Sequence, residues 1–470
     1  MHHDLSPRDI KSKLLLPNAR VALEKGKCFD DPKFVLVLGF KQAQQAYIIP
    51  VLESHLTMRS KNISSEPVWR HYGWLITVAC TICVAVALGF GRFALGMLLP
   101  AMGASLQLDY AEMGFVSTFN FVGYTIGVIT APLLVPLIGE RWTIAGGLII
   151  VALSLLAVGQ AAGFISLLVI YSLTGVAGGC ANVTALGLVS HWFTRKLRGM
   201  AAGFQVSGSS FAIIFVGLTL PSINVAVGPD GWRVGWMLLG SLSILGALFA
   251  GVVLRNRPAA LGLKPAGTND DIPSTNKVRG HPGAQTVTHL GIIYFFFGMT
   301  YSVYLTFMVT SLVRERGLSE IEAGHFWTIL GLMTLISGPV FGFLSDKLGR
   351  KNALAIAFSV YGTAYALAAI GSGVLSQWAS VSIFGLAGWS IPAILGAAVG
   401  DYSGPRNAVK VLGTITVAFS IGQVTGPALG GLLAEATGSF VPGYWAIAAA
   451  SAIAILISLA LPPPKLTNVD

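Results

Sequence analysis

The sequence predicts an all-α polytopic membrane protein with about twelve transmembrane helices in two six-helix bundles. Hydrophobic residues make up 54% of the chain and charged residues only 11%, whereas soluble domains carry about 25% charged residues. Apolar windows of about 20 residues, the length that crosses a bilayer core of about 30 Å, recur from Trp74 to Leu461. Short polar turns separate the windows. These three observations exclude a soluble fold.

The apolar windows give the order of the expected helices and domains. The helices cover residues 72–100, 110–137, 141–160, 164–191, 199–226, 232–255, 288–313, 319–345, 352–372, 376–400, 407–436 and 441–462. The expected domains are a polar N-terminal extension (1–70), an N-terminal six-helix bundle (71–257), a cytoplasmic linker (258–287), a C-terminal six-helix bundle (288–462) and a cytoplasmic tail (463–470).

The two polar segments carry separate expectations. The linker is rich in Pro, Gly and polar residues without a long apolar period, which predicts a mobile strap. The extension has no signal-peptide pattern, because its apolar runs are short and no small-residue cleavage site follows them. Met58 opens the segment that leads into the first helix, so we expect residues 1–57 to be untranslated or dispensable.

Basic residues gather in alternate turns, which predicts the orientation of the chain. One set of turns holds Arg141, Arg195, Lys196, Arg198, Arg255, Arg257, Lys264, Lys277, Arg279, Lys347, Arg350, Lys351, Arg406 and Lys410, and the other set holds Arg233, Arg314 and Arg316. Because cytoplasmic turns are enriched in Lys and Arg, both termini are expected in the cytoplasm, with the chain in a cell inner membrane or plasma membrane. This placement explains the net charge of +10 without a nucleic-acid partner.

Cysteine and histidine patterns argue against an enzyme. Cys80 and Cys83 form a Cys-x-x-Cys pair inside an apolar helix with no second pair, which favours packing over redox chemistry or metal binding. The eight histidines show no ligand spacing. We therefore expect no catalytic residues, no metal and no cofactor.

A charged turn in the second half carries the strongest motif. Residues 342–351 read Gly-Phe-Leu-Ser-Asp-Lys-Leu-Gly-Arg-Lys, which resembles the signature loop of the major facilitator superfamily of transporters. A glycine-proline pattern downstream resembles the helix that this superfamily places at the contact between its halves; it comprises Gly413, Gly422, Gly426, Pro427, Gly430 and Gly431. The resemblance implies the major facilitator fold and a secondary transporter whose two bundles rock around a central site.

Within the superfamily, further segments resemble the YbfB/YjiJ-like branch of bacterial transporters. They are Gly91-Arg92-Phe93-Ala94, Leu98-Leu99-Pro100-Ala101-Met102, Tyr294, Gly298, Tyr301, Thr306-Phe307, Ile391-Pro392-Ala393 and Gly400-Asp401-Tyr402. The first half departs from the superfamily pattern. Pro136 stands where its loop should carry an acid, and Tyr171 stands where many proton-coupled exporters carry arginine. The departures argue against proton antiport by that route.

Arg92 is the only Lys or Arg well inside an expected helix. Its placement there costs roughly 2.5 to 3.5 kcal/mol on insertion scales, so a partner must compensate the charge. Every acid from residue 72 onward falls near a helix end or in a loop. Two interpretations remain open: an anionic substrate binds Arg92, or helix dipoles, tyrosines or glutamine satisfy a structural arginine.

Polar and aromatic residues at mid-depth are candidates for the rest of a substrate site. They are Asn120, Tyr124, Gln205, Tyr301, Tyr304, Trp327 and Trp389. Tyr and Trp offer an apolar body with one hydrogen-bonding tip, which suits an amphipathic small molecule. The charged turn has a different expected role. Asp346 can pair with Arg350 and latch the halves in one state, so Gly342, Asp346, Arg350 and Lys351 are predicted to form a conformational switch.

The expected function is therefore secondary active or facilitative transport of a small organic solute, with an organic anion as one candidate, by a monomer in a lipid bilayer. Two alternatives stay open. One is efflux of amphipathic or drug-like compounds, and the other is a membrane sensor or scaffold that does not transport, suggested by the degenerate loop of the first half.

Overall fold

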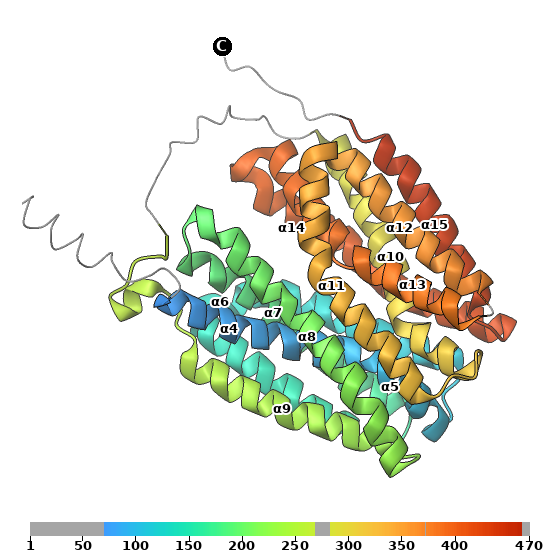
Figure 1. Ribbon diagram of the computed structural model, residues 1–470. Coiled ribbons are helices and arrows are strands. Elements are labelled where there is room, and N and C mark those ends of the chain that lie inside the picture. The colour runs from blue at the N-terminus through green and yellow to red at the C-terminus, as the bar shows by residue number, and fades with distance from the viewer. Residues whose placement is uncertain (1–69, 268–282, 372, 463–470) are drawn as a thin grey trace, which may run out of the picture. The chain divides into compact units, whose positions relative to one another are not determined.

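The computed structural model describes residues 70–267, 283–371 and 373–462. Within these residues the chain is helical, with one isolated β-bridge between Phe193 and Ala266. Figure 1 shows the helices in chain order. They are α4 (Tyr72–Val84), η2 (Ala85–Phe93), α5 (Ala94–Ser105), α6 (Tyr110–Val158), α7 (Phe164–Trp192), α8 (Arg195–Val227), α9 (Gly231–Val253), η3 (Pro258–Leu261), α10 (Ala284–Arg314), α11 (Glu320–Leu348), α12 (Arg350–Ile370), α13 (Val374–Ala387), α14 (Ser390–Thr437) and α15 (Val441–Leu459).

The expected number of membrane spans agrees with these helices. In the described part of the chain, 11 helices are long and apolar enough to cross a membrane. One of them is α6, whose 49 residues would measure about 74 Å as a straight helix, more than twice a bilayer core. Gly139 breaks α6 with φ 80° and ψ 160°, so α6 contains two spans. The chain then has the twelve spans that the sequence predicts, and the fold class is confirmed.

The helices form two halves, α4–α9 and α10–α15, that contact through α5 with α10, α6 with α14 and α8 with α11. Glycines permit the close approach. A Cβ at Gly114 would collide with the carbonyl oxygen of Pro427, and one at Gly431 would lie 2.5 Å from the carbonyl oxygen of Tyr110. A Cβ at Gly217 would likewise lie 2.7 Å from a backbone oxygen of α11. Bare backbone on these faces lets helices pack without a hydrophobic driving force.

Hydrogen bonds also join the halves. We call the end of the molecule where α9 ends, before Leu254, and α10 begins, after Gly283, the linker end and the opposite end the far end. At the far end, the backbone N–H of Tyr110 donates to Glu435 Oε2 (3.0 Å) and Asn224 Nδ2 donates to Glu320 Oε2 (2.7 Å). At mid-depth, Thr334 donates to Ser210 Oγ (2.9 Å), and the hydroxyls of Ser117 and Thr306 are 2.9 Å apart.

The glycine-proline pattern of α14 serves two contacts rather than the single contact expected. Gly431 and Pro427 face α6, as described above. A Cβ at Gly422 would collide with the Phe295 carbonyl oxygen of α10 in the same half, and Gly426 and Gly430 also face α10. Gly413 has open space around it. The pattern therefore holds the second half together as well as joining the halves.

The first third of the expected linker is held against the first half. The backbone N–H of Ala266 donates to the carbonyl oxygen of Trp192 (2.8 Å), and the N–H of Thr194 donates to the carbonyl oxygen of Ala266 (2.9 Å). Residues 258–267 are therefore anchored to the first half through Ala266, residues 268–282 lie outside the described residues, and the mobility of the linker stays a prediction. The second bundle begins at Ala284. The proposals for residues 1–57 and for the tail also fall outside the described part of the chain.

Candidate functional site

The first span contains a π-helical segment, η2, between α4 and α5. Each π turn holds more residues than an α turn, and such segments are frequent at functional sites. A Cβ at Gly89 would collide with the Cβ of Ala212 in α8, so this glycine is needed for η2 to lie against α8. Arg92 lies in the last turn of η2. Helical periodicity alone did not predict this segment.

The guanidinium of Arg92 is buried between aromatic rings, with 9% of the residue exposed. Its central carbon lies 3.9 Å from the ring centroid of Tyr124 and 4.6 Å from that of Phe121, where a cation is attracted to the ring faces. Its Nε and Nη2 atoms are buried without a hydrogen-bond partner. Within the described residues, Arg92 forms no ion pair. Its hydrogen-bonding capacity is therefore only partly used.

Neighbouring amides and hydroxyls fix the position of this arginine. Asn120 Nδ2 donates to the carbonyl oxygen of Tyr171 (3.0 Å), and the Tyr171 hydroxyl donates to the carbonyl oxygen of Arg92 (3.1 Å). Asn182 Nδ2 donates to the Tyr124 hydroxyl (2.8 Å). These bonds tie η2, α6 and α7 together. The backbone and the ring partner of Arg92 are thus held in place before any ligand binds.

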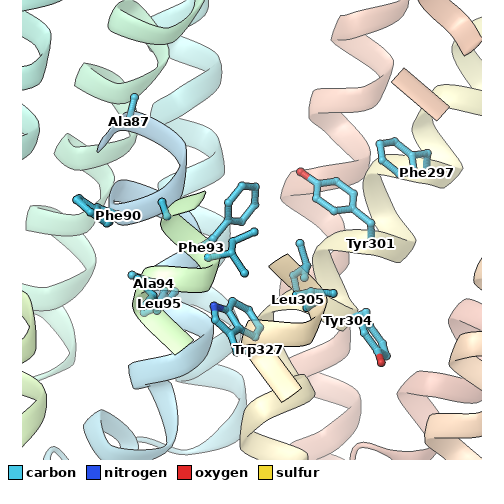
Figure 2. Close-up of a cluster of buried hydrophobic side chains, with 14 of the residues drawn as sticks. Ala87, Phe90, Phe93, Ala94, Leu95, Phe297, Tyr301, Tyr304, Leu305 and Trp327 are labelled. Atoms are coloured by element: carbon cyan, nitrogen blue, oxygen red, sulfur yellow. The ribbon is translucent and has the colours of Figure 1, made fainter. Parts of the chain in front are cut away.

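A cavity at Arg92 is lined by residues of both halves. They are Arg92, Phe93, Leu95, Gly96, Ser117, Asn120, Phe121, Tyr171, Tyr301, Leu305 and Thr306. The Tyr301 hydroxyl accepts a hydrogen bond from Gln423 Nε2 (2.9 Å). Figure 2 shows Tyr301 pointing from its helix toward Phe93 of the first half. We call this space the arginine cavity.

A second cavity shares Tyr301 and Leu305 with the arginine cavity. Its lining is Ile213, Tyr301, Leu305, Leu330, Thr334, Phe384, Gly388 and Trp389. The ring centroids of Trp389 and Phe93 are 5.6 Å apart, so the walls of the two cavities touch. We call it the apolar cavity. Each cavity encloses about 10 Å³, room for about one water molecule, so a solute needs the halves to part.

Of the expected substrate residues, the structure brings Arg92, Asn120, Tyr124, Tyr301 and Trp389 together. Tyr124 contacts the guanidinium of Arg92 with its ring but, like Tyr304, Trp327 and Gln205, it lies outside both linings. The Tyr304 hydroxyl is hydrogen-bonded to Ser380 Oγ (2.7 Å), and Figure 2 shows its ring directed away from Tyr301. The Trp327 ring packs where a Cβ at Gly96 would lie, and its Nε1 has no partner. Gln205 is fully buried, and neither of its amide atoms has a partner.

Sequence reasoning missed Ser117 and Phe121 in α6, although a signal for them exists. Ser117, Asn120, Phe121 and Tyr124 are spaced i, i+3, i+4, i+7, so they lie on one face of a helix. Asn120 and Tyr124 were expected at the site. The helical period adds Ser117, which precedes them, and Phe121, which lies between them. In the sequence, Tyr171 stood out only because many proton-coupled exporters carry arginine at its place. In the structure, its hydroxyl donates to the carbonyl oxygen of Arg92 and so positions the backbone there.

The charged turn between α11 and α12 forms an ion-pair network. Arg350 Nη1 donates to Asp346 Oδ1 (2.7 Å), Arg350 Nε donates to Asp401 Oδ2 (2.7 Å), and Ser345 Oγ is a further partner. Lys351 is exposed. All three partners of Arg350 belong to the second half. The expected pair with Asp346 is therefore present, but it ties α11 to α12 and α14 and does not join the halves.

The corresponding turn of the first half has the same backbone geometry with reversed charge. Gly139 has φ 80° and ψ 160°, and Gly349 has φ 82° and ψ 157°. The residue that follows is Glu140 in the first half and Arg350 in the second. Glu140 Oε1 lies 3.6 Å from His191 Nε2 and 3.5 Å from Arg257 Nη2. The loop that looked degenerate thus keeps its turn, and its acid pairs with the base Arg257, the reverse of the Arg350 pairs with acids.

Twelve spans in two halves, with a cavity lined by both, define a multi-pass membrane protein of the major facilitator type, in agreement with solved structures of that fold. The family model described as "Uncharacterised MFS-type transporter YbfB" matches residues 84–459, and the chain belongs to this family of the major facilitator superfamily. The resemblance seen in the sequence is thereby confirmed.

Named proteins are similar to the chain over most of its length. The hexuronate transporter of Bacillus subtilis (strain 168) is 26% identical over 393 residues, which cover 79% of this chain and 89% of the relative. Monocarboxylate transporter 2 of Homo sapiens is 21% identical over 417 residues, 83% of this chain and 86% of the relative. A bacterial homologue of the human lysosomal transporter Spinster aligns with TM-score 0.66 at 16% identity, covering 83% of this chain and 96% of that structure.

Proposed function

We propose that this protein transports a small organic anion by alternating access and that Arg92 binds the negative charge. The observation that carries the proposal is the buried guanidinium with two unpartnered nitrogens in a cavity that both halves line. A guanidinium in a dry site is stabilised by a carboxylate, which accepts two parallel hydrogen bonds from it. The aromatic rings at Arg92 supply only part of that stabilisation.

Two relatives support an acid as cargo, since their names refer to hexuronate and monocarboxylate. Transport by rocking of the halves is supported by the position of the hydrogen bonds between them, at the far end and at mid-depth. We propose that the protein acts as a monomer in the bilayer, without covalent chemistry and without nucleic acid.

Thermal stabilisation of the detergent-purified protein by organic acids, sugars and amphipathic drugs tests the proposal. Carboxylates should stabilise the wild type and an Arg198→Gln control, which removes an exposed arginine of α8, but not Arg92→Gln. Stabilisation of all three proteins by neutral or cationic compounds, with no response to acids, would instead identify an exporter of amphipathic molecules.

We propose that the linker end faces the cytoplasm, because basic residues concentrate there. Ala162 at the far end and Ala260 at the linker end are both exposed and make a matched pair. With Cys28 replaced by serine, a membrane-impermeant maleimide should label Ala162→Cys in intact cells and Ala260→Cys only after permeabilisation. The described cysteines Cys80, Cys83 and Cys180 are buried. The reverse labelling pattern would invert the proposed topology.

We propose that the Gly342–Lys351 turn controls the rate of conformational change and does not touch cargo. Asp346→Asn removes a pair whose acid side chain is 69% exposed, and exposed pairs contribute about 0 to 1 kcal/mol, so turnover should fall by at most about fivefold. Substrate affinity should be unchanged. Asp230→Asn, which removes an acid of similar exposure (67%) at the far end, is the control. A loss of affinity equal to the loss of turnover would place Asp346 in substrate binding.

A further inference from the structure

The two adjoining cavities differ in the hydrogen-bonding groups that they offer to a solute. The arginine cavity presents the unpartnered Nε and Nη2 atoms of Arg92 together with the hydroxyl pair of Ser117 and Thr306. In the apolar cavity, most lining side chains are hydrocarbon or aromatic, among them Ile213 and Leu330. A solute that spans both spaces therefore meets a charge at one end and apolar surface at the other.

The few polar atoms of the apolar cavity are already bonded within the protein. Thr334 donates to Ser210 Oγ (2.9 Å) and lies 2.8 Å from the carbonyl oxygen of Gly331. The indole Nε1 of Trp389 donates to the same serine (3.4 Å). The carbonyl oxygen of Gly388 accepts from the Tyr361 hydroxyl (2.8 Å). A cargo with several hydroxyls would have to break these bonds or leave its own groups unpaired, and either is costly in a buried site.

Aromatic rings from the two linings contact each other. The Phe93 ring belongs to the arginine cavity and the Trp389 ring to the apolar cavity, and the two rings meet across the halves at 41°. When the halves part, this contact is lost, and an apolar body can take the place of either ring. A planar or branched hydrocarbon group replaces that contact better than a hydrated polyol does.

We propose that the cargo is a monocarboxylate with an apolar body, whose carboxylate binds Arg92 and whose body lies against Trp389 and Leu330. This inference rests on the proposed anion transport and adds the substrate class. It distinguishes between the two kinds of acid in the names of the relatives: the site favours an apolar monocarboxylate over a polyhydroxylated sugar acid.

Three probes separate the possibilities in calorimetric binding measurements on the purified full-length protein. They are phenylacetate, its uncharged analogue phenylacetamide, and glucuronate as a polyhydroxylated acid. Phenylacetate should bind at least about tenfold tighter than glucuronate, because its ring gives up no hydrogen bonds to water when it enters an apolar cavity. Phenylacetamide should bind at least about tenfold weaker than phenylacetate, because it lacks the charge that pairs with Arg92.

Substitutions in the apolar cavity then test whether the ring of phenylacetate binds there. Trp389→Ala should weaken phenylacetate binding about tenfold or more and leave glucuronate little changed, as loss of a buried aromatic contact does. Trp445→Ala, at a tryptophan that is 46% exposed, is the control. Should Trp389→Ala fail to fold, Leu330→Ala tests the same wall, and its expected loss is about threefold or more.

Each outcome has a distinct meaning. Arg92-dependent binding of glucuronate that is tighter than that of phenylacetate would overturn the substrate class and leave the proposed anion transport intact. Equal binding of phenylacetamide and phenylacetate in wild type and Arg92→Gln would overturn both proposals. Loss of phenylacetate binding in Trp389→Ala or Leu330→Ala, with glucuronate unaffected, would support the assignment. If neither phenylacetate nor glucuronate bound, the assignment would be overturned.

Discussion

Substitution of Arg92 by glutamine should weaken carboxylate binding by about 30-fold or more. Removing one partner of a buried charged pair costs about 2 to 5 kcal/mol, and each 1.4 kcal/mol is about a tenfold change in affinity. Glutamine keeps a polar side chain of moderate length but supplies no charge. Isothermal titration with wild type, Arg92→Gln and the Arg198→Gln control gives the ratio directly.

The Arg92→Lys variant separates the effect of the positive charge from that of the guanidinium geometry. An ammonium keeps the charge but cannot donate in the planar two-bond geometry of a guanidinium, and it stacks less well on the rings of Phe121 and Tyr124. Arg92→Lys should therefore retain part of the affinity, between wild type and Arg92→Gln. If the Arg92→Gln variant bound carboxylates as tightly as the wild type, Arg92 would be a structural arginine satisfied by aromatic rings. The proposed cargo class would then have no support.

The sequence predicted the fold, and it singled out the arginine at the centre of the proposed site, for identifiable physical reasons. Apolar windows and basic turns report the membrane directly. Arg92 is conspicuous because a charge inside a membrane helix needs compensation. These signals depend on residue type alone, so no knowledge of tertiary contacts was needed.

Features that depend on contacts between helices could not be predicted in this way. The π segment requires Gly89 to meet Ala212, a pair far apart in the sequence. Tyr301 and Tyr304 are both mid-depth tyrosines, yet about 60° separates them around the helix axis, and only the packing of the second half shows which faces the cavity. The pair between Glu140 and Arg257 was not predicted, because the first-half loop was compared with a motif in which position 140 is basic.

Substitution of Gly114 by valine should shift the protein toward a state with the far end open. Gly114 meets the carbonyl oxygen of Pro427 and the Cα of Gly431, which are backbone atoms and cannot move aside as side chains do. Overpacking of this kind costs about 1 to 3 kcal/mol, which is about 5- to 150-fold in a conformational equilibrium. The cost falls only on states in which α6 and α14 touch, so the population of the opposite state rises.

Distances between spin labels at Ala162→Cys and Ala436→Cys measure this shift, because both positions are exposed at the far end and lie in different halves. With Cys28 replaced by serine, Gly114→Val should lengthen the main distance or raise a minor longer one. Gly146→Val, in the second span of α6, is the matched control, since its Cβ would meet open space. An unchanged distance distribution in a folded Gly114→Val protein would show that the α6–α14 contact does not set the far-end closure on which alternating access depends.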